Sequence, residues 1–172
     1  MTGVQTCALP ILPDCWLVAG CLFQTVWNLK SGRPPTENIS DYDIFYFDAG
    51  DLSAAAEAAH NARAAALFAP LGVTIEVKNQ ARVHTWFESY FGYPYSALRD
   101  SREGIDRYLV LCTCVGIQSG QSGQSGYTLY APNGLSDLYA GVLRPNSLNN
   151  PAEVYLSKAQ SYAARWPWLH VN

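Results

Sequence analysis

The feature that most constrains this chain is a pair of carboxylates two residues apart at the start of an apolar run. Asp41 and Asp43 lead into residues 44–47, Ile-Phe-Tyr-Phe, a stretch typical of a buried strand. Because the side chains of a strand alternate between its faces, both carboxylates share one face, about 7 Å apart at their Cα atoms. Two unpaired carboxylates so close together repel each other and lose hydration. The pair therefore predicts a cation, and we expect Mg²⁺ (or Mn²⁺), a hard ion that carboxylates and phosphates hold.

Length and charge narrow the classes of protein to which the chain belongs. Its 172 residues suit one domain with a core of its own. The net charge is −3 without a basic block, which argues against a tight, nonspecific grip on long nucleic acid. No apolar run approaches the roughly 20 residues of a membrane span, so we expect no membrane partner.

The first eleven residues and the cysteines need separate treatment. Residues 1–11 resemble the translation of a sequencing-adapter oligonucleotide, so we expect an artefactual segment with the natural N-terminus missing, followed by a single domain over 12–172. The remaining cysteines are Cys15, Cys21, Cys112 and Cys114. The last two form a C-x-C pair without a nearby histidine, which is a poor zinc signature. We therefore expect small buried side chains in a cytoplasmic protein.

Hydrophobic periodicity predicts an α+β (mixed α/β) fold, with helices packed on a mixed sheet. Strands are expected over 16–19, 42–47, 73–77, 108–117 and 127–131, and helices over 21–30, 53–68 and 135–143. Residues 82–91 are predicted to be helical or irregular, and 93–107 a loop with a short helix. A last helix begins at Pro151 with Asn150 as its cap, and the repeated Gln-Ser-Gly over 118–126 predicts a flexible hairpin loop.

Two further features join the carboxylate pair. Gly20 stands at a strand-to-helix junction, where a glycine allows close approach of a ligand and the helix N-terminus offers free N–H groups to phosphate. Glu76 is central in a later strand, where a carboxylate is costly unless it is paired or faces a cleft. Asp41, Asp43 and Glu76 together would hold two metal ions for phosphoryl transfer. Glu76 could alternatively act as the base for an acceptor hydroxyl.

These residues resemble the nucleotidyltransferase superfamily related to DNA polymerase beta, which has a glycine turn, a D-x-D motif and a third carboxylate on a later strand. The chain is most similar to a bacterial family of uncharacterised nucleotidyltransferase-like proteins. The matching stretches are residues 16–21, 25–28, 40–44, 76–84, 130–135 and 144–146. The resemblance implies transfer of a nucleoside monophosphate from a nucleoside triphosphate to an unknown hydroxyl acceptor. One departure is Cys21, where the superfamily has Gly or Ser after the first glycine, and a thiol is a poorer donor than a hydroxyl.

The nucleotide-binding residues expected beside the carboxylates are Gly20, Cys21, Lys78 and Arg82. Lys78 shares the face of Glu76 and would neutralise phosphate, or else form a salt bridge within the sheet. Arg82 suits a bidentate grip on phosphate, or else is a surface cation.

Two other functions stay open. A catalytically inert transferase fold that binds nucleotide or a protein partner is suggested by Cys21, and a D-x-D glycosyltransferase by the carboxylate pair alone.

Overall fold

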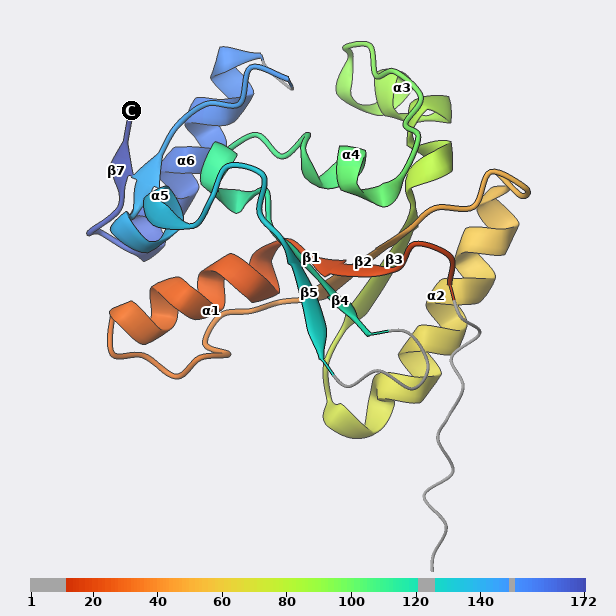
Figure 1. The fold of residues 1–172 in the computed structure, drawn as a ribbon, viewed down its shortest axis with the longest axis horizontal. Helices are drawn as coiled ribbons and strands as arrows, with labels where there is room; N and C mark the ends of the chain where they lie inside the picture. The colour runs from red at the N-terminus through yellow and green to blue at the C-terminus, as the bar shows by residue number, and fades with distance from the viewer. Residues whose placement is uncertain (1–11, 121–125, 149–150) are drawn as a thin grey trace, which may run out of the picture.

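The structure of the protein is a computed structural model, which describes residues 12–120, 126–148 and 151–172. The predicted artefactual segment 1–11, the centre of the 118–126 loop and Asn150 lie outside these residues. Figure 1 shows the order of the elements along the chain. The strands are β1 (Trp16–Val18), β2 (Tyr42–Tyr46), β3 (Ile75–Asn79), β4 (Gly116–Ser119), β5 (Tyr127–Tyr130), β6 (Val142–Leu143) and β7 (His170–Val171). The α-helices are α1 (Gly20–Lys30), α2 (Ala54–Phe68), α3 (Phe87–Phe91), α4 (Ser101–Ile105), α5 (Ser136–Ala140) and α6 (Ala152–Arg165). Short 3₁₀ turns are η1 (Ala69–Leu71), η2 (Gln80–Thr85) and η3 (Leu111–Thr113).

Five strands form a mixed sheet in the order β3-β2-β1-β4-β5. β1 runs antiparallel to both β2 and β4, β4 runs antiparallel to β5, and β2 runs parallel to β3. The parallel pair is joined through α2, as parallel strands require a long crossover. The sheet and its helices confirm the predicted α+β class.

The two faces of the central strands bury different clusters. On one face, Tyr46 and Val77 pack with Ala64 of α2. On the other face, Trp16 and Val18 pack with Ile105 of α4. Because strand side chains alternate, the face of Val18 also carries Asp43 and Glu76. The D-x-D pair therefore begins on the α4 side of the sheet.

The largest cluster lies beyond the sheet, between α1, α5 and α6. Trp27 is fully buried there, with its ring centroid 5.3 Å from those of both Tyr162 and Trp166. Figure 1 shows α6 above α1, on the opposite side of the molecule from α2. Trp166 is 1% exposed. These contacts fix the C-terminal end of α6 beside the second half of α1.

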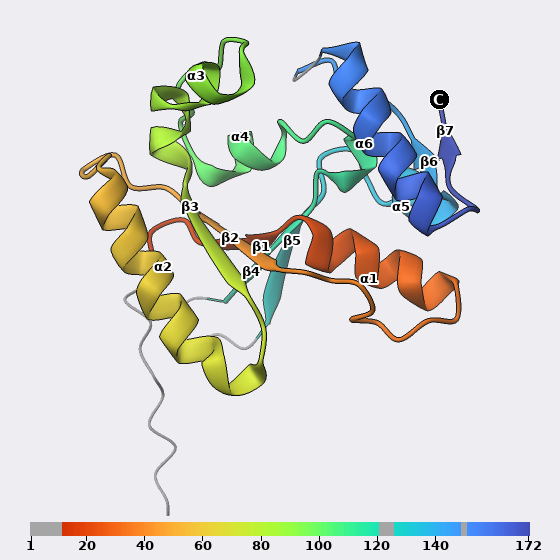
Figure 2. The same ribbon diagram turned by 180° about the vertical axis from the view of Figure 1, so that it is seen from behind.

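The outer edge of β3 is bonded to side chains of α2. Asn61 donates to the carbonyl of Val77 and accepts from its N–H, with both distances at 2.7 Å. Glu57 accepts the N–H of Asn79 at 2.7 Å. Figure 2 shows α2 running beside β3, and these bonds hold the helix against the sheet.

Most predicted elements form, but the strand expected over 108–117 is wrong. Only its end is extended, since β4 begins at Gly116, and η3 occupies the middle. Thr113 donates its hydroxyl to the Val110 carbonyl at 2.7 Å, a local side-chain bond that competes with a strand ladder. The apolar character of the segment reflects burial in a loop, where Cys112 and Cys114 are 2% and 1% exposed. β3 also lies two residues later than the strand predicted over 73–77.

Candidate functional site

Asp43 and Glu76 are brought together by the pairing of β2 with β3. Val18, Asp43 and Glu76 are register partners in one row across β1, β2 and β3. The side chains of Asp43 and Glu76 share a hydrogen bond, and the charge of Asp41 acts on Asp43 as well. The structure therefore places the three predicted carboxylates in one neighbourhood, with Asp43 at its centre.

The electrostatics of this neighbourhood disfavour a charged Asp43. Burial, followed by the charges of Asp41 and Glu76, raises the pKa of Asp43 from 3.8 to about 7. Two like charges in one partly buried place cannot both be stable without a counter-charge. Lys78 supplies a counter-charge, since its Nζ lies 3.0 Å from Glu76 Oε1. Lys78 thus forms the salt bridge within the sheet that the sequence left as its alternative role.

The junction between β1 and α1 is bent at Ala19 instead of Gly20. Ala19 has φ 64° and ψ −145°, a region that residues with a side chain occupy only under strain. Gly20 begins the helix, and a Cβ there would lie 2.5 Å from the Gln24 amide nitrogen. The helix starts without a side-chain cap, so N–H groups of its first turn lack the usual internal partner. A strained turn before such an N-terminus suits the approach of an anion.

The thiol of Cys21 is engaged within the protein. Cys21 is buried, and its thiol donates to the Val18 carbonyl at 3.2 Å. Burial, with the charge of Asp43 as the next cause, raises the pKa of the thiol to about 12. Cys21 is therefore a neutral packing residue, and only its backbone N–H is suited to a phosphate.

Arg82 is not brought to the carboxylates. Its Nη1 lies 2.8 Å from Glu57 Oε1, and its Nε donates to the Leu52 carbonyl at 3.1 Å. Leu52 precedes α2 and Glu57 lies in its first turn, so the two bonds of Arg82 hold η2 against the start of that helix. The alternative of a freely exposed surface cation does not apply either, because only 13% of its side chain is exposed.

Sequence reasoning missed two cations of α6, Lys158 and Arg165, and the second of them contacts α1. Arg165 Nη1 donates to Gln24 Oε1 at 3.3 Å, and Gln24 covers Gly20. Lys158 Nζ and Arg165 Cζ each lie 5.3 Å from the ring centroid of Tyr162. Within the described ranges, neither cation has a carboxylate within salt-bridge distance. Their spacing of seven along one helix was the signal available in the sequence, but it says nothing about where α6 docks.

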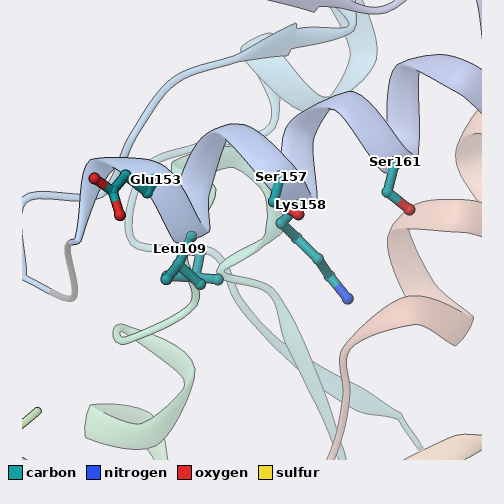
Figure 3. Close-up of a pocket in the computed structure, with 6 residues that line it drawn as sticks. Leu109, Glu153, Ser157, Lys158 and Ser161 are labelled. Atoms are coloured by element: carbon teal, nitrogen blue, oxygen red, sulfur yellow. The ribbon is translucent and has the colours of Figure 1, made fainter. Parts of the chain in front are cut away.

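A cavity of about 460 Å³ opens along the same helix. Figure 3 shows Glu153, Ser157, Lys158 and Ser161 spread along α6, with Leu109 below the first turns of the helix. The remaining lining residue of the cavity is Val154. Ser161 precedes Tyr162, whose pKa is raised by burial and, to a smaller extent, by the charge of Asp43. Asp41, Asp43 and Glu76 are not among the residues that line the cavity.

The donor set fits a divalent cation, although the ligands are not preassembled. Asp41, Asp43 and Glu76 offer oxygen ligands, which Mg²⁺ and Mn²⁺ prefer, and the charges of Asp41 and Glu76 add to the effect of burial in raising the pKa of Asp43. Among the described residues, no group of three His, Cys, Asp or Glu side chains has the geometry to hold a metal ion. Binding of a cation by Glu76 would therefore require Lys78 to leave that carboxylate.

No helix in the described part of the chain has the length and apolar character to cross a membrane. Comparison with known proteins found no match among curated proteins. A solved structure described as an NMR structure that reveals a CCA-adding enzyme head domain has a TM-score of 0.72 with this chain and 26% sequence identity. The match covers 94% of this chain and 82% of that one. A family profile described as nucleotidyltransferase matches residues 5–171, so this chain belongs to that nucleotidyltransferase family.

Proposed function

We propose that this protein transfers a nucleoside monophosphate from a nucleoside triphosphate to a hydroxyl acceptor in a reaction that requires Mg²⁺ or Mn²⁺. The observation that carries the proposal is the row in which Asp43 stands beside Glu76, next to the strained entry into α1. Asp41, Asp43 and Glu76 would hold the cation. When bound, it would neutralise the carboxylates and stabilise negative charge that develops on the phosphate oxygens.

The residues of the protein would position the substrate and neutralise its charge. The N–H groups of Gly20 and Cys21 would bind the phosphates at the helix N-terminus. Lys158 and Arg165 would neutralise the triphosphate from α6, in place of Arg82. Once Lys78 is displaced from Glu76, its ammonium lies on the same face as the carboxylates and would also face the substrate.

The bonds formed and broken balance without another reactant. The acceptor hydroxyl oxygen attacks the α-phosphorus, and the bond from that phosphorus to the bridging oxygen of pyrophosphate breaks. Pyrophosphate leaves with the electron pair, and the proton of the hydroxyl passes to water. The solved structure that resembles this chain is described as part of a CCA-adding enzyme, which supports transfer of a nucleotide. The acidic net charge favours a small molecule or a protein as acceptor over long nucleic acid.

The test is incubation with each labelled nucleoside triphosphate, Mg²⁺ or Mn²⁺, and a cell extract. Label should pass to an acceptor with the natural protein and not with Asp43→Asn. Asp137→Asn is a matched control, because Asp137 forms an exposed pair with Arg144 away from the site. Transfer that survives in Asp43→Asn would refute the proposal.

A second function has its own support. The Lys78–Glu76 pair and the absence of a preassembled metal site in the described residues are also what an inert, nucleotide-binding transferase fold would show. Calorimetry with nucleotide separates the two. Binding that neither Mg²⁺ nor Asp41→Ala alters would favour the inert fold. The family match favours both over a D-x-D glycosyltransferase.

A further inference from the structure

The outer edge of β5 lacks charges and prolines that would prevent another strand from pairing with it. β5 pairs only with β4 among the described strands, and its four residues are Tyr-Thr-Leu-Tyr. Proteins commonly protect an exposed edge with lysine, proline or a covering loop, because such an edge pairs readily with another chain. An uncharged, aromatic edge therefore indicates a surface that a second strand covers.

The unpaired backbone groups of this edge belong to Tyr127 and Leu129. Beyond the end of β4, the Gly120 N–H donates to the Gly126 carbonyl at 2.9 Å. Hydrogen-bonded and non-hydrogen-bonded positions alternate along an antiparallel pair, so Thr128, two residues after Gly126, also directs its N–H and carbonyl at β4. The N–H and carbonyl groups of Tyr127 and Leu129 therefore point away from β4.

The same two residues carry apolar side chains on one face of the sheet. The side chains of Tyr127 and Leu129 are 82% and 53% exposed. Leu129 also lines a hollow of about 370 Å³ between the sheet, α1 and α5. Apolar residues that line the hollow beside Leu129 are Leu22, Val26, Ile117, Leu135 and Tyr139.

A second copy of β5 fits this edge in one symmetrical register. A two-fold axis that passes through Thr128, perpendicular to the sheet, keeps each face of the sheet continuous. It places Tyr127 of each copy opposite Leu129 of the other, so the outward backbone groups of both residues meet in two hydrogen-bonded pairs. Residues opposite each other share a face, so each Tyr127 ring packs on the Leu129 side chain of the other copy. Such an interface is isologous and closes at two copies.

The exposed apolar surface is sufficient for a dimer. Its four exposed side chains are those of Tyr127, Leu129, Leu135 and Tyr139. At roughly 200 Å² for a tyrosine and roughly 150 Å² for a leucine, their exposed fractions amount to about 450 Å² in each copy. Two copies would cover about 900 Å² through these side chains, and the paired backbones bring the total to the roughly 1,000 Å² of a specific interface.

We propose that this protein forms a two-fold symmetric dimer in which the β5 strands of two copies pair and join the two sheets into one. The proposal does not depend on the transferase reaction, because that reaction uses no residue of β5. A strand of another protein is the alternative occupant of the edge.

The first test is sedimentation equilibrium of the full chain, which separates the mass of one copy, 18.9 kDa, from twice that mass. The natural protein should dimerise reversibly. Leu129→Lys should raise the dissociation constant about 100-fold, which is tenfold for each of the two symmetrical contacts. Leu71→Lys is the matched control, because Leu71 is 69% exposed on η1, and it should dimerise as the natural protein does.

The second test probes the register. Thr128 is exposed and stands opposite itself across the proposed axis, with about 4.5 Å between the two Cα atoms. Thr128→Lys and Thr128→Glu should each weaken the dimer, because like charges lie directly opposite each other. An equimolar mixture of the two variants should restore the dimer, because the charges across the axis are then opposite. The mixture serves as its own control for folding, since it contains only the two variants.

The remaining outcomes overturn the proposal. A natural protein that stays monomeric up to about 1 mM would leave the edge to a strand of another protein. A dimer that Leu129→Lys does not weaken, or that Leu71→Lys weakens equally, would place the contact elsewhere. A mixture of the Thr128 variants that dimerises no better than either variant alone would exclude the symmetrical pairing of β5, including the case in which Leu129→Lys fails to fold.

Discussion

Replacing Asp43 with asparagine should stabilise the metal-free protein at high pH and leave it unchanged at low pH. The pKa of Asp43 is raised from 3.8 to about 7 by burial and by Asp41 and Glu76, so the folded protein binds this proton more tightly than the unfolded chain. The contribution of protonated Asp43 to the free energy of unfolding is therefore complete below about pH 4 and is lost as the pH rises to about 7. Asparagine is an uncharged isostere that avoids this loss, because it can donate to Glu76 at every pH.

The size of the effect follows from the pKa values. A difference of about three units, at 1.36 kcal/mol each, gives roughly 4 kcal/mol. Part of the Asp43 side chain is exposed to water, which screens its interaction with the neighbouring charges. We therefore expect about half of that free energy, ~2 kcal/mol at pH 8.

The assay is urea denaturation followed by tryptophan fluorescence between pH 4 and pH 8, with a chelator present. Asp43→Asn should exceed the natural protein in unfolding free energy by ~2 kcal/mol at pH 8 and by nearly nothing at pH 4. Asp137→Asn, which removes a carboxylate from an exposed pair, should show no such rise. A difference that is independent of pH, or a natural protein that is the more stable at pH 8, would refute the reasoning.

Three further predictions follow from the same contacts. In steady-state assays, Lys158→Gln should raise the KM for nucleoside triphosphate about tenfold through the loss of a charged contact. Arg82→Gln breaks the pair with Glu57 and should leave this KM unchanged. The reverse result would restore Arg82 to the site. Ala19→Gly should raise the free energy of unfolding in urea by about 1 kcal/mol, since glycine adopts the positive φ of residue 19 without strain. An unchanged urea midpoint would show that the turn holds no strain. Asn28→Ala should lower the free energy of unfolding by about 3 kcal/mol. The reason is that Asn28 donates to the carbonyls of Pro35 and Glu37 and accepts from the Trp166 indole. A loss below about 1 kcal/mol would contradict this account.

Local pattern was sufficient to predict the strand that holds the carboxylates. Asp43 was expected on one face of a buried strand, and β2 places it there because strand periodicity is a property of neighbouring residues. The same reasoning failed over residues 108–117, where an apolar composition reflected burial in a loop. Apolar runs of this length do not distinguish a strand from other buried segments.

Long-range partners account for what the sequence could not predict about the site. Arg82 was expected to bind phosphate, but its partner Glu57 is 25 residues earlier, on a helix whose docking no local pattern reveals. Arg165 reaches Gln24 of α1 because Trp27 packs on Tyr162 and Trp166. The roles of cations in this fold are therefore decided by how helices dock on the sheet.

The bonds between Asn61 and Val77 also decide in which direction the sheet can grow. The amide of Asn61 reproduces the pair of bonds that a neighbouring strand would make, so β3 has no room for another strand beside it. At the opposite margin, β5 pairs only with β4 among the described strands, and its first residue, Tyr127, is 82% exposed. Any strand added by a partner or by a longer form of the protein must therefore join next to β5, away from the carboxylates.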